Sequence, residues 1–124
     1  MISIKRLNQS FAYAIQGLKY VWRNEQNFRI QVFIGILVVT AMLIFRVSMG
    51  EAIILTMLII FVMVLEVVNT IFEKIVDILK PRMHTYVAVI KDMMAAAVFI
   101  ASFGSAIIAC MVFIPHFIDL LQSL

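Results

Sequence analysis

Residues 52–80 read AIILTMLIIFVMVLEVVNTIFEKIVDILK, and this stretch decides the fold. Its first part, residues 52–65, contains no charged residue, as expected for a helix that crosses a membrane. Four polar side chains then follow at offsets of three, four and four: Glu66, Asn69, Glu73 and Asp77. On an α-helix these offsets place all four on one narrow stripe. Carboxylates at membrane depth are costly unless they are paired, hydrated or bound to metal, so the stripe predicts a functional site.

The composition is that of a membrane protein. Of the 124 residues, 65% are apolar and 14% are charged, and the mean hydropathy is +1.10. A soluble domain has about 45–50% apolar and about 25% charged residues, so that class is excluded. We expect one small integral membrane domain covering residues 1–124. The single cysteine, Cys110, has no partner for an intrachain disulfide and is interpreted as a small apolar side chain.

The N-terminal segment predicts an amphipathic helix over about residues 4–23. Its apolar side chains recur at helical spacing along one face: Leu7, Phe11, Ile15, Leu18 and Trp22. Basic and amide side chains project in other directions, a pattern typical of a helix that lies in the headgroup region of a membrane. The same pattern is also consistent with a helix that only packs against the membrane spans.

Three apolar runs predict three transmembrane helices, over about residues 30–45, 52–72 and 92–113. Arg29 and Arg46 bracket the first run, which is slightly short for a bilayer unless both arginines extend toward the headgroups. Residues 47–50 are expected to form a tight turn. The second helix should continue past the membrane edge and end at Lys80-Pro81-Arg82, because proline cannot continue the helical hydrogen bonding.

The positions of the basic residues predict the topology. Most precede the first run or lie between the second and third: Lys5, Arg6, Lys19, Arg23, Arg29, Lys74, Lys80, Arg82 and Lys91. By the positive-inside rule, the N-terminus and the second connection face the cytoplasm, while the first connection and the C-terminus face outward. The sequence has no basic cluster interleaved with aromatic residues. We therefore interpret the basic residues as membrane anchors and expect no nucleic-acid partner.

The acidic residues gather at the predicted cytoplasmic interface. Five of the seven fall there: Glu25, Glu66, Glu73, Asp77 and Asp92. With Asn24 and Lys91 nearby, they provide what a Mg²⁺–nucleotide site needs, because Mg²⁺ is held by one or two carboxylates plus phosphate oxygens and a lysine can bind phosphate. A carboxylate can also deprotonate an attacking hydroxyl. The chain has no glycine-rich phosphate loop, so phosphoryl transfer would use another design.

Each of these residues also has a structural interpretation. Glu66 could make a polar contact between helices, and Glu73 and Asp77 could form a solvated face. Lys91 and Asp92 could be interfacial anchors, and His84 could be a solvated loop residue. A different function is a non-enzymatic bundle that conducts protons or cations through Glu66, although this would leave the cluster of Asn24, Glu25, Lys91 and Asp92 without a role.

Three motifs resemble those of the prokaryotic diacylglycerol kinase and undecaprenol kinase family. They are Asn24-Glu25-x-x-Phe28-Arg29, Glu66-x-x-Asn69-x-x-x-Glu73-x-x-x-Asp77, and Lys91-Asp92 followed by an alanine run. Their order and spacing match over most of the chain, from about Arg6 to Ala97. The resemblance implies a homotrimeric lipid kinase of the prokaryotic inner membrane, with a surface helix and three spans per protomer. Its active sites would be shared between neighbouring subunits.

The resemblance also implies roles for individual residues. Glu66 would be the catalytic base, with Asn69 and Asp77 supporting the site. Glu25 and Glu73 would hold the divalent metals, expected to be Mg²⁺. ATP would be bound by a larger set: Arg6, Tyr13, Glu25, Glu73, Arg82, Met83, His84, Lys91 and Asp92.

Two departures from the family pattern affect these expectations. Met94 and Ala95 stand where members commonly have small Gly or Ser residues, which bears on packing against the nucleotide. Gln31 stands where some members carry an acid, which bears on recognition of the lipid headgroup.

The leading hypothesis is an ATP-dependent kinase of a membrane alcohol, either diacylglycerol or undecaprenol. Residues 27–30 slightly favour undecaprenol, by resemblance alone. A catalytically decayed member is the third alternative, but no motif is lost.

Overall fold

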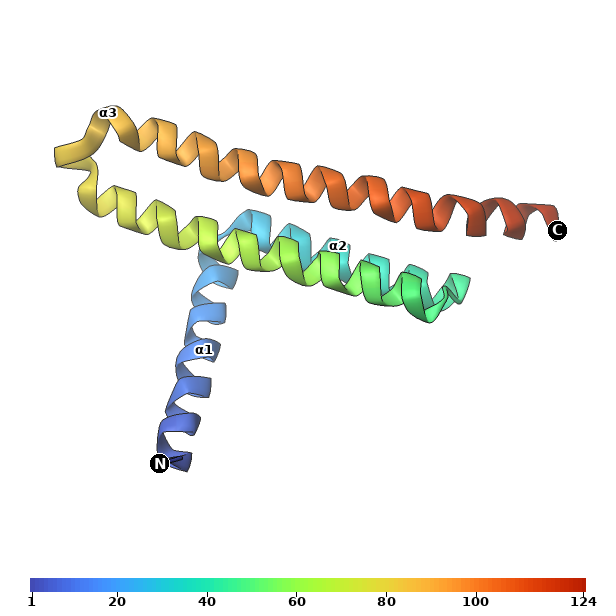
Figure 1. The fold of residues 1–124 in the computed structure, drawn as a ribbon, viewed down its shortest axis with the longest axis horizontal. Helices are drawn as coiled ribbons and strands as arrows, with labels where there is room; N and C mark the ends of the chain where they lie inside the picture. Colours follow the sequence, from blue (N-terminus) through green and yellow to red (C-terminus); the bar gives the residue numbers. More distant parts are fainter.

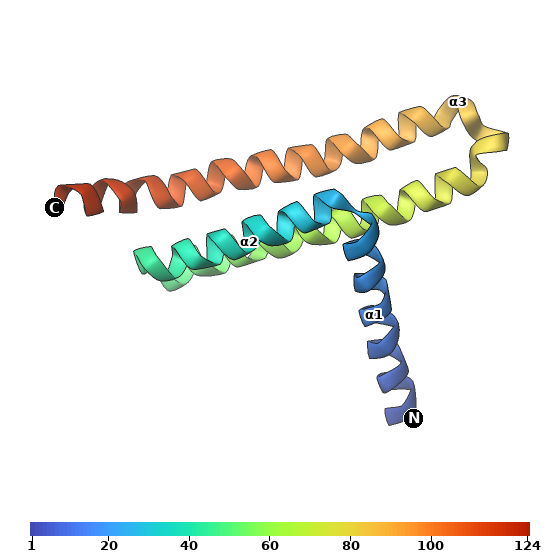
Figure 2. The ribbon, with the colours of Figure 1, turned by 180° about the vertical axis from the view of Figure 1, so that it is seen from behind.

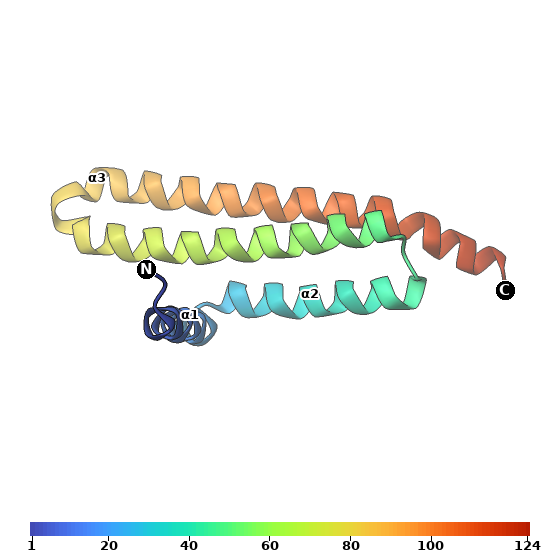
Figure 3. The ribbon, with the colours of Figure 1, turned by 60° about the horizontal axis from the view of Figure 1, so that its bottom comes forward.

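The computed structural model describes residues 1–79 and 85–124. It contains helix α1 (Ile4–Asn24), helix α2 (Gln26–Phe45) and helix α3 (Met49–Gln122), and the described residues include no strand. Within α3, two apolar limbs, Met49–Leu79 and Thr85–Gln122, run antiparallel and side by side (Figures 1 and 3). The helix end expected at Lys80-Pro81-Arg82 lies outside the described residues.

Three helical segments are long and apolar enough to cross a membrane: Gln26–Phe45, Met49–Leu79 and Thr85–Gln122. The prediction of an all-α membrane fold with three spanning helices is therefore confirmed. Each helix extends beyond the apolar run that predicted it, because the helical backbone continues into the polar flanks. Helix α2 begins at Gln26 and so includes Arg29, which was expected to lie just before the first span. The Arg29 side chain extends back to α1.

Helix α1 confirms the predicted amphipathic helix. The Ser3 hydroxyl accepts a hydrogen bond from the Arg6 backbone N–H at 3.5 Å and so caps its N-terminus. The helix crosses the direction of the other helices and carries the N-terminus away from them (Figures 1 and 2). Val21, in its last turn, is its one buried side chain. Helix α1 therefore leaves its apolar face available to a membrane surface or to another protein chain.

The connection between α2 and α3 is shorter than the expected turn at residues 47–50. Helix α3 already begins at Met49, with Ser48 as its N-cap. The Ser48 hydroxyl accepts from the Glu51 N–H at 3.2 Å, and the Glu51 carboxylate accepts from the Ser48 N–H at 3.0 Å. This capping box satisfies two backbone donors. A serine followed three residues later by a glutamate is the sequence signature of a helix N-terminus, and it places the start of α3 earlier than hydropathy does.

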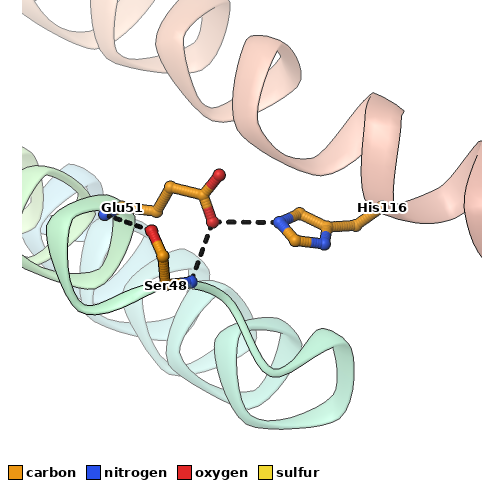
Figure 4. Close-up of polar contacts among 3 residues, drawn as sticks. All are labelled: Ser48, Glu51 and His116. Carbon is orange, nitrogen blue, oxygen red and sulfur yellow. Dashed lines mark hydrogen bonds and ion pairs between the residues drawn. The ribbon is translucent and has the colours of Figure 1, made fainter.

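The two limbs of α3 are joined by polar contacts near both ends. Close to the connection with α2, Nε2 of His116 lies 2.9 Å from Oε2 of Glu51, which also belongs to the capping box (Figure 4). Near the opposite end, Nζ of Lys91 lies 2.7 Å from Oδ1 of Asp77. These two pairs fix the register of the second limb against the first.

The Glu51–His116 contact leads to a prediction about stability. Replacement of Glu51 by alanine should lower the Tm in detergent more than replacement of His116 by alanine, because Glu51 serves both the cap and the cross-limb pair. Thermal unfolding of both single variants and the double variant measures the coupling between them. Additive Tm losses would show that the cross-limb contact contributes nothing.

Helix α2 packs closely against the first limb of α3. Gly35 is buried, and a Cβ atom at this position would lie 3.2 Å from Cγ2 of Ile59. Leu55 and Val62 are buried on the first limb, as is Phe28 on α2. This contact brings the N-terminal end of α2 beside the polar stripe that starts at Glu66.

Candidate active site

Glu66 is one of the most buried side chains in the protein, with 1% of its surface exposed. It lies on the first limb of α3. From α2, Gln31 donates a hydrogen bond through Nε2 to Glu66 Oε2 at 3.3 Å. One turn further along the limb, the Thr70 hydroxyl donates to the backbone carbonyl of Glu66 at 3.0 Å. The acid is therefore held between two helices.

Three buried oxygen atoms around Glu66 have no hydrogen-bond donor among the described residues. They are Oε1 of Gln31, Oε1 of Glu66 and Oδ1 of Asn69. Buried acceptors without a partner are rare and cost free energy, so a cluster of them calls for a partner that residues 1–79 and 85–124 do not supply. All three accept hydrogen bonds or bind cations. The partner they fit is a hydroxyl group or a metal ion.

The polar stripe continues from Glu66 along the first limb. Asn69 is 8% exposed, and its Nδ2 donates to Oε1 of Glu73 at 3.4 Å. Glu73 is half-buried, as is Glu25, which comes from the start of α2. Both carboxylates lie within electrostatic range of Glu66. The structure therefore places Glu66, Asn69 and Glu73 along one face of the first limb, with Glu25 in electrostatic range of Glu66.

Glu25 is the single residue between α1 and α2. Its backbone is extended, with φ −112° and ψ 107°, so the chain changes direction there. Its N–H donates to the carbonyl of Val21 at 2.8 Å, and its carbonyl accepts from the N–H of Arg29 at 3.4 Å. Nη1 of Arg29 donates to the carbonyl of Trp22 at 2.7 Å. These hydrogen bonds connect the end of α1 with the start of α2 on either side of Glu25.

Lysine residues flank the acidic cluster. Lys91 pairs with Asp77 across the two limbs, and both side chains are partly exposed. Nζ of Lys74 lies 5.7 Å from the centre of the Tyr20 ring, which links the first limb to α1. Lys74 also lies within electrostatic range of Glu25. Asp92 is exposed beside Lys91.

Some of the predicted site residues are not brought to this cluster. Arg6 and Tyr13 are exposed on α1, which runs away from the other helices (Figure 1), and Tyr13 is 67% exposed. Arg82, Met83 and His84 lie outside the described residues. Within one protomer, the structure therefore brings Glu66 and Glu73 onto one helix face and pairs Lys91 with Asp77, while the α1 residues expected to bind ATP lie apart from them.

Two contacts of the site were missed from the sequence. Gln31 was noted only as a departure from a family pattern, but it is the hydrogen-bond partner of Glu66. The signal was available, because Gln31 is the single amide side chain in the apolar run of residues 30–45, which has no charged residue. Arg29 was interpreted as a membrane anchor, whereas its guanidinium binds the end of α1.

The carboxylates fit a Mg²⁺ ion that is completed by a substrate. No group of three acidic, histidine or cysteine side chains suited to a metal occurs among residues 1–79 and 85–124. Mg²⁺ usually takes only one or two carboxylates and completes its shell with water and phosphate oxygens. Glu25 and Glu73 supply two carboxylates, and the unpaired Asn69 Oδ1 is a further oxygen in the same cluster. Oxygen donors of this kind are the ligands that Mg²⁺ prefers.

Comparison with known proteins places this site in a family. The sequence model of prokaryotic diacylglycerol kinase matches residues 12–113. A diacylglycerol kinase of Synechocystis is 31% identical over 90% of this chain, which spans 65% of the length of that relative. The diacylglycerol kinase of Escherichia coli K12 is 30% identical, with 90% of this chain and 92% of the relative covered.

A third relative carries a different name. The undecaprenol kinase of Bacillus subtilis is 30% identical, with 90% of this chain and 91% of the relative covered. The family match covers all three segments in which the site residues lie, namely the α1–α2 junction, the polar stripe and the start of the second limb. With three helices able to cross a membrane, the chain is a multi-pass membrane protein, and it belongs to the prokaryotic diacylglycerol kinase family of lipid kinases.

Proposed function

We propose that this protein transfers the γ-phosphoryl group of ATP to the hydroxyl of a membrane lipid alcohol at the cytoplasmic face of the membrane, with Mg²⁺ as the required ion. The observation that carries this proposal is the buried Glu66, which has one oxygen bonded to Gln31 and the other without a partner in the part of the chain that the structure describes. A lipid hydroxyl lies at headgroup level, where the apolar part of the first limb ends and Glu66 begins the polar stripe.

Glu66 acts as the general base in this proposal. As the lipid oxygen bonds to the γ-phosphorus, the bond from that phosphorus to the β–γ bridging oxygen breaks and ADP leaves. The hydroxyl proton passes to Glu66 Oε1, the atom without a partner. Gln31 holds the other oxygen and so fixes the orientation of the carboxylate. Such positioning is a large part of the catalysis of phosphoryl transfer.

Glu25 and Glu73 would hold Mg²⁺ in this site. A Mg²⁺ ion held there would supply positive charge that neutralises the charge developing on the phosphates. Asn69 orients Glu73 through its Nδ2 hydrogen bond. Lys91, which Asp77 holds at the rim of the cluster, is available to bind phosphate, with Asp92 beside it. By resemblance, the remaining contacts to ATP come from Arg6, Tyr13, Arg82, Met83 and His84.

A homotrimer with shared sites accounts for the position of α1. Arg6 and Tyr13 lie away from the carboxylates of their own protomer, so they would reach ATP bound to a neighbouring subunit. Large apolar side chains remain exposed along α2 and both limbs, including Phe33, Phe61 and Phe99. They provide surface for contacts with other subunits and with lipid. The charge distribution favours a cell-membrane location with the N-terminus in the cytoplasm and the C-terminus outside.

A lipid substrate is supported by a cavity lined in part by Gln31, the hydrogen-bond partner of Glu66. The cavity has a volume of about 220 Å³ and lies between α2 and both limbs of α3. Gln31 stands at its polar end, and its other walls are mainly apolar, including Val38, Leu55 and Val62. Such a cavity suits a hydrocarbon chain whose hydroxyl reaches Glu66. Relatives named for diacylglycerol and for undecaprenol are equally similar at 30% identity, so both alcohols are candidate acceptors.

The proposal is tested with the purified protein in lipid nanodiscs. Labelled ATP and Mg²⁺ are supplied with either diacylglycerol or undecaprenol, and the phosphorylated lipid is separated and counted. We expect label in at least one of the two lipids and none when Mg²⁺ is chelated. Absence of label in both lipids, together with proton flux through liposomes that is lost in Glu66→Gln, would support a conducting bundle instead.

The topology gives a separate prediction. In a Cys110→Ala background, single cysteines at Thr85 and Ser123 should label on opposite sides of sealed, right-side-out vesicles. Ser123 should react with an impermeant maleimide, whereas Thr85 should react only after the vesicles are opened. Equal labelling at the two positions would contradict the three-span arrangement with a cytoplasmic N-terminus.

A further inference from the structure

The angle between α1 and α2 must be stabilised by contacts across their junction. The last four carbonyls of a helix have no partner within that helix, and Glu25 is the single residue that separates α1 from α2. A one-residue connection of this kind can rotate about its own φ and ψ. The direction of the Glu25 carboxylate therefore depends on what ties the end of α1 to the start of α2.

Arg29 provides this tie. Its Nη1 donates to the carbonyl of Trp22 at 2.7 Å and to that of Arg23 at 3.2 Å, so one guanidinium satisfies two carbonyls of the last turn of α1. Arg29 itself lies one turn into α2, and its N–H donates to the Glu25 carbonyl at 3.4 Å. The Arg29 side chain therefore reaches from α2, past Glu25, to the last turn of α1. A cation at this place also complements the dipole of α1.

The other contacts at the junction do not replace that of Arg29. Asn24 donates from Nδ2 to the carbonyl of Tyr20 at 2.8 Å, a bond that remains within α1. The Lys74 ammonium lies over the Tyr20 ring and connects α1 with α3, not with α2. Among the side-chain hydrogen bonds of the described residues, those of Arg29 are the ones that link α1 to α2.

We propose that Arg29 is a positioning residue, whose guanidinium holds the α1–α2 junction so that the Glu25 carboxylate stays in electrostatic range of Glu66. The inference rests on the proposed function to the extent that Glu25 acts as a metal ligand there. Without the guanidinium, two carbonyls lose their donor and the Glu25 backbone is free to turn. Arg29 therefore acts on the metal site through Glu25, without touching metal or substrate.

The chain contains its own reporter for this junction. Trp22 is its single tryptophan, and its carbonyl is the one that Arg29 binds most closely. In Arg29→Ala, the steady-state fluorescence anisotropy of Trp22 should fall, because the last turn of α1 becomes more mobile. In Glu25→Ala the anisotropy should stay at the parental value, because the Arg29 guanidinium donates to main-chain carbonyls, and these hydrogen bonds do not involve the Glu25 carboxylate. This measurement requires neither ATP nor metal.

The functional test is a Mg²⁺ titration of lipid phosphorylation by the full-length protein in nanodiscs. Arg29→Ala should raise the half-saturating Mg²⁺ concentration by about tenfold or more, the scale found when a group that orients a metal ligand is removed. The double variant Arg29→Ala/Glu25→Ala should need no more Mg²⁺ than Glu25→Ala alone, because both changes remove the same ligand. Arg29→Lys, which keeps the charge but donates to fewer carbonyls, should fall between parent and Arg29→Ala and provides a second variant if Arg29→Ala does not fold. Lys19→Ala removes an exposed cation of α1 and serves as the matched control, with parental values expected.

The outcomes separate this inference from the proposed function. If Glu25→Ala raises the Mg²⁺ requirement and Arg29→Ala does not, the positioning role is overturned while the metal role of Glu25 stands. Unchanged Trp22 anisotropy in Arg29→Ala would overturn it as well, since the junction would then hold without the guanidinium. If neither variant changes the Mg²⁺ requirement, Glu25 is not a metal ligand and both proposals fail at this residue.

Discussion

Replacement of Glu66 with glutamine is expected to lower the rate of lipid phosphorylation by roughly 10²–10⁴-fold, the usual contribution of a general base. The substitution removes the proton acceptor and keeps the size and polarity of the side chain. Glu66 is 1% exposed, so solvent has little access with which to take its place as base. The measurement is the initial rate of phosphorylated lipid formation at saturating ATP, Mg²⁺ and lipid.

The folded state should tolerate this change. In Glu66→Gln, the new amide group can donate to Oε1 of Gln31, which has no partner in the parent. The buried site would then gain a hydrogen bond and lose a carboxylate at membrane depth, which favours a folded variant. Equal Tm and equal oligomer size for variant and parent would show that the lost rate is not caused by misfolding.

A matched control lies on the same limb of α3. Glu51→Gln makes the same chemical change at the far end of that limb, where Glu51 contacts Ser48 and His116 (Figure 4). It should retain the parental rate because it lies outside the site. If Glu66→Gln keeps more than about a tenth of the parental rate, Glu66 is not the base, because base catalysis contributes at least about a hundredfold.

The sequence predicted the helices well because their signals are local. Long apolar runs, the amphipathic pattern of α1 and the offsets in the polar stripe depend on residues close together in the chain. Helix ends were less accurate, because hydropathy reports where the apolar side chains stop and not where backbone hydrogen bonding stops. The start of α3 shows this: Met49 and Gly50 were assigned to a turn, but the Ser48–Glu51 capping box already places them in the helix.

In the candidate site, too, contacts within one helix could be predicted from the sequence, whereas contacts between helices could not. Glu66, Asn69 and Glu73 could be grouped from spacing because they share one helix face. The partner of Glu66, Gln31, is 35 residues away, and the partner of Glu51, His116, is 65 residues away. Such pairs depend on the register between helices, which the spacing within one helix does not determine. The positions of Arg6 and Tyr13 relative to ATP also depend on neighbouring subunits, so their roles remain predictions.

Replacing either Glu25 or Glu73 with alanine is expected to raise the half-saturating concentration of Mg²⁺ or Mn²⁺ by at least about tenfold, beyond any loss of maximal rate. Removing a residue that merely orients a ligand costs about 10–100-fold in metal affinity, so removing a ligand should cost at least as much. The two carboxylates come from different segments, the α1–α2 junction and the first limb of α3. A shared effect on metal dependence therefore implies a shared ion.

The decisive experiment is a metal titration of kinase activity at saturating ATP and lipid for Glu25→Ala, Glu73→Ala and Asp119→Ala. Asp119 is an exposed acid near the C-terminus, in the last turn of α3, so its loss should leave the metal dependence at the parental value. If both glutamate variants also keep the parental value, these carboxylates only stabilise the structure and the metal binds elsewhere. If only Glu73→Ala shifts the titration, the ion is held by the polar stripe alone, and Glu25 acts through its charge on the neighbouring Glu66.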